Sequence, residues 1–390
     1  MTSSDPGDRA RRAVQRATRT LDHPLGSASL RERLGELVAR ADDLVDLDAT
    51  VDVYGGGVVA ELERRVAELL GTPDALFFPT GTMAQQVALR CWAQRSGRRT
   101  VALHALSHPQ VHEADALVRV AGLEPVHVTT APRPVSGADV RALPEPVGTL
   151  MLELPLRDAG FLLPTWEELL DVVAAARERG AAVHLDGARL WESTTHLGRE
   201  LSEIAGLADS VYVSFYKSLR GLSGAALAGP SDLVDQARLW RHRYGGNVFQ
   251  QFPAVLSALD GLERERPRLP GYVAHARRVA AALAQELTVA GSAVHPPVPH
   301  THQFQVWLPH PARVLDEAAT RQAERSGTAL FTRPWREPGR PPGTAYTEVT
   351  VTGPGLDWSE QDVRAAAREF LGLVATVAAE GLPAPESGNA

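Results

Sequence analysis

Residues 210–221 read Ser-Val-Tyr-Val-Ser-Phe-Tyr-Lys-Ser-Leu-Arg-Gly, an apolar segment typical of a buried strand that runs directly into Lys217. Lys217 is the only lysine of the 390-residue chain, in which lysine and arginine together number 40. An arginine can replace lysine as a surface cation, but its guanidinium stays protonated and does not attack a carbonyl. The sequence therefore predicts that the Lys217 amine takes part in chemistry. One leftover lysine in an arginine-rich chain is the simpler alternative.

Short apolar segments that predict strands alternate with helical segments over much of the chain. The strands are expected at residues 75–78, 100–105, 124–129, 148–154, 181–186 and 210–215. This alternation predicts an α/β fold in which helices cover both faces of a mainly parallel sheet. Ligands of such sheets bind at the carboxyl ends of the strands. Asp186 ends one predicted strand, and Lys217 lies just beyond the end of another.

The turn Thr80-Gly81-Thr82 joins a predicted strand to a helix that is expected to begin near Met83. Free N–H groups and the helix dipole make such a turn a candidate phosphate cradle, although most similar turns bind nothing. With Asp186 and Lys217 it suits pyridoxal 5'-phosphate (PLP). The lysine condenses with the aldehyde, and the carboxylate keeps the pyridine nitrogen protonated, which makes the ring an electron sink.

Composition argues against several other classes of protein. The net charge is −7 and there is no basic block, which speaks against a nucleic-acid partner. No run of about 18 apolar residues predicts a membrane span, and no signal-peptide core is evident, so we expect a cytoplasmic protein. The single cysteine, Cys91, excludes an internal disulfide and a cysteine-based metal cluster. We expect Cys91 to be buried and no metal to be bound.

The segment pattern also predicts the domain organisation. We expect an N-terminal arm and helix at residues 1–50 and a large PLP-binding domain at 51–265. A smaller α+β C-terminal domain is expected at 266–380, followed by a disordered tail at 381–390. The change of pattern near residue 291, toward short Pro-rich strands, is what indicates the second domain.

Several motifs together resemble the threonine aldolase / β-eliminating lyase family of fold-type I PLP-dependent enzymes, within the aspartate aminotransferase superfamily. The matching segments are VYGGG (53–57), LERRVAELLGTPDALFFPTGTMAQQVAL (62–89), SHPQVHEA (107–114), HLDGARLWE (184–192), SVYVSFYKSLRGLSGA (210–225) and WRHRYGGN (240–247). The resemblance implies a homodimer or homotetramer that cleaves a β-hydroxy amino acid to glycine and an aldehyde.

The resemblance also implies roles for single residues. Lys217 would form the imine with PLP, Asp186 would pair with the pyridine nitrogen, and His108 would stack on the ring, with Glu113 at the family's spacing. Further residues would bind the cofactor: Arg189 near the phenolic oxygen, and Thr80, Gly81, Thr82, Ser214 and Tyr54. Tyr54 matches a tyrosine that reaches the site of a neighbouring subunit. His184 is expected to be a packed strand residue.

One departure from the family follows Glu153. The family has a second active-site histidine there, which is implicated in handling the substrate hydroxyl. Residues 154–158 read Leu-Pro-Leu-Arg-Asp and contain no histidine. Arg157 and Asp158 are the candidates to replace it, but neither is a base of the same kind near neutral pH.

Two more departures concern arginines. Phe249 occupies the position of a phosphate-binding arginine, which Arg241 or Arg243 could replace. Glu348 aligns with the arginine that clamps the substrate carboxylate, and a carboxylate there is electrostatically unfavourable. Either Arg333 takes over the clamp or the substrate differs.

Aldol cleavage is the leading expectation because the motifs cover so much of the chain. The missing histidine favours β-elimination, or another PLP reaction such as that of an aminotransferase or an enzyme of specialised metabolism. A binding or regulatory protein that keeps only the fold is the non-enzyme alternative. The retained pair of Lys217 and Asp186 argues against it.

Overall fold

The computed structural model describes residues 6–22, 28–339 and 342–381. The chain forms two compact units, residues 30–270 (the central unit) and residues 1–29 with 271–390 (the terminal unit). The domain boundaries expected at residues 50, 265 and 380 stay predictions. The expected tail, apart from Gly381, lies outside the described residues.

The central unit is built on a seven-stranded sheet in the order β2-β8-β7-β6-β5-β3-β4. Its strands are β2 (Asp74–Phe78), β3 (Thr100–Leu103), β4 (Glu124–His127), β5 (Thr149–Glu153), β6 (Ala182–Gly187), β7 (Ser210–Ser214) and β8 (Ala225–Gly229). Strand β8 runs in the opposite direction to the other six strands, so the predicted, mainly parallel α/β fold is confirmed. The segment 225–229 was not predicted as a strand, because it reads Ala-Ala-Leu-Ala-Gly and contains no β-branched residue.

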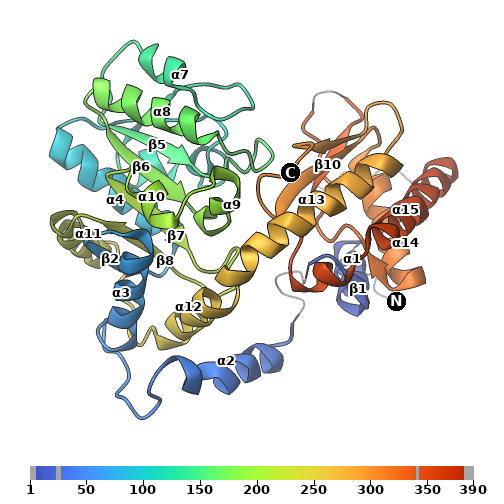
Figure 1. Cartoon of the computed structure of the whole chain (residues 1–390), viewed down its shortest axis with the longest axis horizontal. Helices are drawn as coiled ribbons and strands as arrows, with labels where there is room; N and C mark the ends of the chain where they lie inside the picture. Colours follow the sequence, from blue (N-terminus) through green and yellow to red (C-terminus); the bar gives the residue numbers. More distant parts are fainter. Residues whose placement is uncertain (1–5, 23–27, 340–341, 382–390) are drawn as a thin grey trace. The chain divides into compact units, whose positions relative to one another are not determined.

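Helices surround this sheet (Figure 1). They are α2 (Leu30–Leu44), α3 (Val58–Leu70), α4 (Gly81–Ser96), α5 (His108–Val111), α6 (Ala116–Arg119), α7 (Gly137–Arg141), α8 (Trp166–Glu178), α9 (Thr194–Leu197), α10 (Leu201–Ala205), α11 (Ser231–Arg243) and α12 (Phe252–Arg264), with 3₁₀ turns at Leu190–Glu192 and Arg266–Arg268. Helix α8 begins with a capping box, in which Thr165 and Glu168 each bond the other's backbone N–H. In the described part of the chain, no helix combines the length and apolar character that crossing a bilayer requires.

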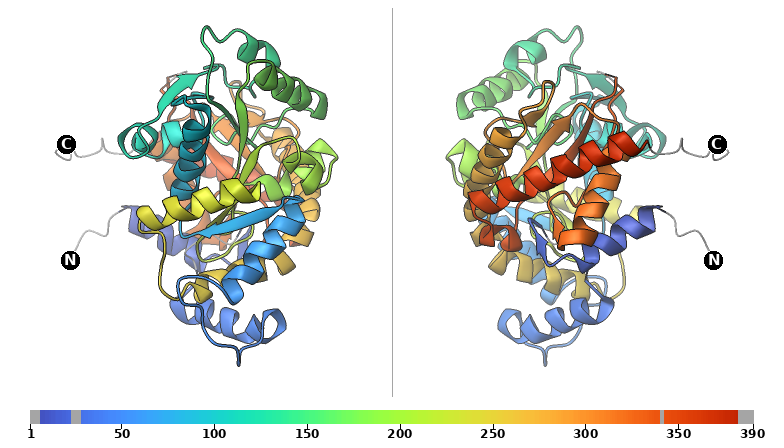
Figure 2. Two further views of the ribbon diagram at one scale, coloured as in Figure 1. Left: turned by 90° about the vertical axis from the view of Figure 1, so that its left-hand side faces the viewer. Right: turned by 90° about the vertical axis from the view of Figure 1, so that its right-hand side faces the viewer.

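Helices α4 and α11 pack against the β2 end of the sheet, and α11 lies beside β2 in the left-hand view of Figure 2. Leu76 and Phe78 of β2 are fully buried beside Leu233 and Val234 of α11. Burying a side chain of this size stabilises the fold by about 1.5–3 kcal/mol. This packing fixes the turn from β2 into α4, where the candidate phosphate cradle lies.

The strand directions bring several chain segments to one edge of the sheet. Strand β2 is antiparallel to β8, and β8 is antiparallel to β7, so β2 runs in the same direction as β7. The carboxyl ends of β2, β3, β5, β6 and β7 therefore lie at the same edge. Residues that follow these strands can meet there although they are far apart in sequence.

The terminal unit is a smaller α+β structure, and it matches the expected C-terminal domain in class. Its strands are β9 (Ala293–His295), β10 (Gln303–Leu308) and β12 (Ala345–Thr350) in the order β12-β10-β9, with a separate pair β1 (Arg19–Thr20) and β11 (Thr328–Ala329). Its helices are α1 (Pro6–Arg16), α13 (Leu269–Glu286), α14 (Ala312–Ser326) and α15 (Glu360–Glu380), with a 3₁₀ turn at Gly353–Asp357. The right-hand view of Figure 2 shows α15 beside α14. The rings of Phe331 and Phe370 meet in its core with centroids 4.8 Å apart.

Candidate active site

Lys217 follows β7 and is partly buried. Its Nζ lies 5.6 Å from the ring centre of Tyr216. Burial and then the charge of Arg189 lower the pKa of Lys217 to about 8, against the opposing effect of Asp186. A lysine with a lowered pKa has more of its amine neutral near physiological pH, which is the form that attacks a carbonyl.

Asp186 lies near the end of β6 and is almost completely buried. Its Oδ1 accepts a hydrogen bond from the Ala188 N–H at 3.1 Å. Burial raises the pKa of Asp186, whereas Lys217 and Arg189 lower it. A buried carboxylate is unfavourable unless a cation or several donors compensate for its lost hydration. Asp186 is therefore suited to hold a cationic group at this strand end.

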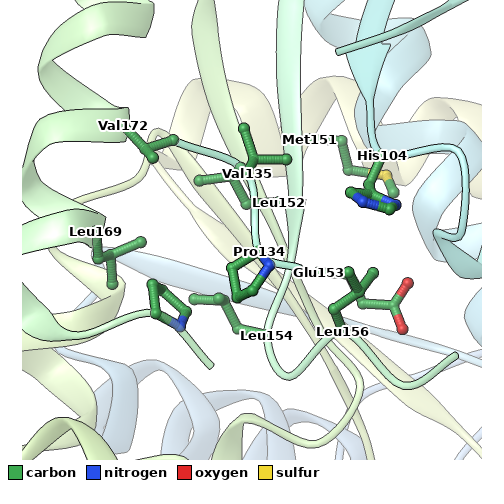
Figure 3. Close-up of a pocket in the computed structure, with 11 residues that line it drawn as sticks. His104, Pro134, Val135, Met151, Leu152, Glu153, Leu154, Leu156, Leu169 and Val172 are labelled. Carbon is green, nitrogen blue, oxygen red and sulfur yellow. The ribbon is translucent and has the colours of Figure 1, made fainter. Parts of the chain in front are cut away.

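Glu153 ends β5 and joins two loops at the sheet edge. Its Oε2 accepts from the His108 N–H at 2.7 Å, and its Oε1 accepts from the Arg157 N–H at 3.2 Å. A small apolar pocket lies beside it (Figure 3). The pocket is lined by His104, Pro134, Val135, Met151, Leu152, Glu153, Leu154, Leu156, Pro164, Leu169 and Val172. Burial and the nearby Asp186 raise the pKa of Glu153.

His108 is the first residue of α5. Burial, followed by the positive charge of Lys217, lowers the pKa of His108 to about 3, so its imidazole is neutral. Its Nε2 lies 3.9 Å from Oε1 of Glu113. The Glu113 carboxylate bonds to the Thr82 side chain, and burial raises its pKa. Among the described residues, Oε2 of Glu113 has no hydrogen-bond partner.

The turn before α4 is the candidate phosphate cradle. Thr80 caps the helix, its hydroxyl accepting from the Met83 N–H at 3.3 Å. A Cβ atom at Gly81 would overlap the hydroxyl oxygen of Tyr212, so only glycine fits. Ser214 lies next to that hydroxyl. The free N–H groups of the first helical turn, with the helix dipole, favour an anion here.

A further buried carboxylate, Glu192, lies in the 3₁₀ turn after Asp186 and Arg189. Its Oε1 accepts from the Ser218 hydroxyl at 2.8 Å. This bond ties the segment that carries Asp186 to the segment that carries Lys217. Burial raises the pKa of Glu192 to about 8, with Arg189 opposing. Sequence reasoning missed this pair, although both residues stand inside motifs that it quoted.

The structure thus brings Lys217, Asp186, Arg189, His108 and Arg157 together. Arg157 lowers the pKa of both Lys217 and His108, which places its charge near both. Arg189 also lies over the Phe161 ring, 5.4 Å from its centre. His184, in contrast, is fully buried and bonds to Ser210 and Gln85, as expected for a packed strand residue.

Other predicted residues stand apart from this group. Tyr54 is 55% exposed and meets the equally exposed Phe249 edge to face, at 5.5 Å between ring centroids. Arg241 donates to the Phe77 carbonyl at 2.6 Å, and Arg243 lies over the Trp240 ring. A phosphate contact by either arginine stays a prediction.

Arg333 and Glu348 belong to the terminal unit. The backbone carbonyl of Arg333 accepts from the Thr347 hydroxyl at 2.9 Å. Glu348 is a buried residue of β12 that pairs in register with Gln305 of β10. Contact of either side chain with a substrate stays a prediction.

Comparisons with known proteins identify the family. Residues 41–306 match the family model for beta-eliminating lyases. The low specificity L-threonine aldolase of Escherichia coli O157:H7 is 31% identical over 225 residues, which are 56% of this chain and 67% of that protein. A solved structure from Exiguobacterium sp. 255-15, assigned as an aromatic amino acid beta-eliminating lyase/threonine aldolase, is 33% identical with a TM-score of 0.85, covering 94% of this chain and 99% of that one. A structure from Listeria monocytogenes, assigned as an L-allo-threonine aldolase, is 32% identical with a TM-score of 0.85, covering 95% and 100%. Because the family model spans more than half of the sequence, this chain belongs to the beta-eliminating lyase family.

Proposed function

We propose that the protein is a PLP-dependent lyase of the threonine aldolase type, which cleaves a β-hydroxy amino acid to glycine and an aldehyde. The observation that carries this proposal is the lowered pKa of Lys217, whose amine lies with the buried Asp186 at one sheet edge. A neutral lysine amine beside a buried carboxylate is the minimum that imine chemistry with a pyridine ring requires.

Three features of the central unit support PLP as the cofactor. The Gly81 cradle offers free N–H groups at the start of a long helix and has no room for a Cβ atom. The buried charge of Asp186 calls for a cation, which a protonated ring nitrogen would supply. The partnerless Oε2 of Glu113 marks a place where a further polar group would bond.

The residues that would hold PLP are those at this edge of the sheet. They are Lys217, Asp186, Arg189, His108, Thr80, Gly81, Thr82 and Ser214, with Tyr54 contributed to a neighbouring subunit. When bound, PLP supplies an electron sink that stabilises negative charge on the substrate Cα. We infer PLP dependence from this fit and from the family.

The chain's own residues have separate tasks in the reaction. Lys217 moves the proton at Cα, because its lowered pKa lets the amine both accept and release a proton near neutral pH. Asp186 provides the negative charge that keeps the ring nitrogen protonated. The neutral His108 adds no positive charge at the ring face, and Glu153 fixes its backbone. We propose that Arg157, whose charge lies near Lys217 and His108, contacts the substrate carboxylate.

Two measurements test this function in the purified, PLP-supplemented protein. Borohydride reduction should fix a pyridoxyl group on Lys217, detected by peptide mass, and the Lys217→Arg variant is the matched control. The absence of an adduct on the wild type would rule out the cofactor assignment. A panel of β-hydroxy and β-substituted amino acids should give glycine and an aldehyde. If the panel instead gives a keto acid with ammonia and no glycine, the reaction is β-elimination and the proposed aldol cleavage is wrong.

We also propose that the chain works as a homodimer or homotetramer. The exposed pair of Tyr54 and Phe249 supports this, because two large exposed aromatic rings in contact are typical of a protein interface. A cytoplasmic location fits the single free and buried Cys91, since reducing compartments do not select for disulfides.

A further inference from the structure

A second imidazole lies beside His108. His112 follows α5 directly, and its backbone N–H bonds to the His108 carbonyl at 2.9 Å, so the two residues are one helical turn apart. Their rings are 5.0 Å apart between centroids, at an interplanar angle of 38°. The sequence analysis assigned no role to His112.

His112 is held by a carboxylate from a distant segment. Its Nε2 lies 2.7 Å from Oδ2 of Asp158, 46 residues away in sequence. The side chain of Asp158 is 11% exposed and that of His112 is 28% exposed. The pair is therefore mostly shielded from water, although part of the His112 side chain remains exposed.

Both ends of this pair are anchored to one residue. Glu153 accepts from the N–H of His108, at the start of α5, and from the N–H of Arg157, next to Asp158. Asp158 belongs to the segment in which the resemblance expects a second histidine. That segment lacks an imidazole of its own, but it brings Asp158 to the imidazole of His112, directly after α5.

The pairing selects one ring nitrogen for chemistry. When a carboxylate accepts from Nε2–H of a neutral imidazole, Nδ1 carries the lone pair and becomes the proton acceptor. Arg157 cannot fill this role because a guanidinium stays protonated. Asp158 cannot fill it while it accepts from His112.

We propose that His112, oriented by Asp158, takes the hydroxyl proton of the β-hydroxy amino acid in place of the histidine that residues 154–158 lack. This inference rests on the proposed aldol cleavage. The hydroxyl proton passes to Nδ1 of His112, and the O–H electron pair forms the aldehyde C=O bond. The Cα–Cβ bond breaks, and its electron pair remains on Cα. Cα then takes up a proton to give glycine, and His112 releases its proton to solvent.

The test compares three variants of the PLP-loaded protein. For His112→Asn we expect kcat for cleavage of a β-hydroxy amino acid to fall by about 100-fold or more, the usual contribution of a general base. For Asp158→Asn we expect a smaller fall, on the order of tenfold, because the ring then loses its tautomer preference. The matched control is His127→Asn, which removes an exposed histidine whose Nε2 bonds to Gln110 on α5. It should keep wild-type kcat within about twofold, since no general base is lost.

A second readout separates a base from a merely structural residue. Exchange of the glycine α-hydrogens with deuterium, followed by NMR, needs PLP and Lys217 but no hydroxyl base. His112→Asn should exchange glycine at the wild-type rate. In the protein without PLP, ¹⁵N shifts of the imidazole should show the Nε2–H tautomer of His112, and Asp158→Asn should lose it.

The outcomes distinguish the two proposals. If the wild type cleaves and His112→Asn cleaves equally fast, the base assignment is overturned and the proposed function stands. The assignment also fails if His112→Asn loses glycine exchange and cleavage in equal measure, or if His112 carries its proton on Nδ1. If the wild type exchanges glycine but cleaves no β-hydroxy amino acid, the proposed function fails and the assignment fails with it.

Discussion

Two regions of the central unit depart from the usual distribution, in which charged side chains are exposed and apolar side chains are buried. One region buries carboxylates, and the other exposes apolar side chains. At the carboxyl ends of the central strands, Asp186 and Glu192 are buried carboxylates. On α2, Leu30, Leu34 and Val38 are apolar residues that are 85%, 61% and 69% exposed. Both arrangements are unfavourable in an isolated chain. The buried carboxylates need cationic or hydrogen-bonding partners, whereas the exposed stripe needs another protein surface.

The largest expected effect is on the reactivity of the Lys217 amine, which lies at the strand ends. Lys217 should react with an acylating reagent with a midpoint near pH 8, because burial and Arg189 lower its pKa to about that value. An ordinary lysine has a pKa near 10.4, so the neutral fraction at pH 7 should be larger by a factor on the order of 10². Labelling of the PLP-free protein from pH 6 to 11 measures it, and the single lysine makes peptide masses unambiguous.

Two variants sharpen this measurement because their effects have opposite signs. Asp186→Asn removes a negative charge that raises the pKa of Lys217, so the midpoint should fall. Arg189→Gln removes a positive charge that lowers it, so the midpoint should rise. A wild-type midpoint above pH 10, or shifts of the same sign in both variants, would show that buried charge does not tune the amine.

The sequence alone predicted the strands of the sheet and the residues at their ends. It did not predict the hydrogen bonds between the segments that follow those strands. The alternation of apolar and helical segments indicated the strands that carry Asp186 and Lys217, because periodicity is a local property. The hydrogen bond between Glu192 and Ser218 joins residues 26 positions apart. The His112–Asp158 bond spans 46 positions. Such pairs depend on how loops close over the sheet, and no local pattern records that.

An intermediate effect is expected at the exposed stripe of α2. Leu34→Glu should weaken self-association at least tenfold, because it removes burial of a leucine, worth about 1.5–3 kcal/mol, and places a charge in an apolar contact. Ala39→Glu is the matched control. It adds the same charge to an exposed position on the opposite side of α2. Sedimentation at several protein concentrations measures both. A monomeric wild type, or equal dissociation of the two variants, would show that this stripe has no part in the proposed homodimer or homotetramer.

A third effect concerns the stability of the fold at the buried carboxylates. Burial raises the pKa of Glu192 from its ordinary value of 4.5 to about 8. Its folded-state pKa is thus raised, so the stability it contributes is complete below about pH 4.5 and is lost as the pH rises through about 8. Glu192→Gln cannot ionise. Relative to the wild type it should therefore gain stability between pH 5 and pH 9, by up to about 4 kcal/mol at 1.36 kcal/mol per pKa unit.

Thermal unfolding of the full chain at pH 5, 7 and 9 measures this gain. Ser218→Ala is the control, because it removes the hydrogen bond to Glu192 but leaves the carboxyl group. Its melting temperature should fall with rising pH at least as steeply as that of the wild type, since the Ser218 bond lowers the pKa of Glu192. Parallel pH curves for the wild type and Glu192→Gln would mean that Glu192 is ionised and paired with Arg189. Glu192 and Arg189 would then form a buried ion pair, in place of a neutral Glu192 carboxyl group. The negative charge of Glu192 would act on Lys217 at all three pH values.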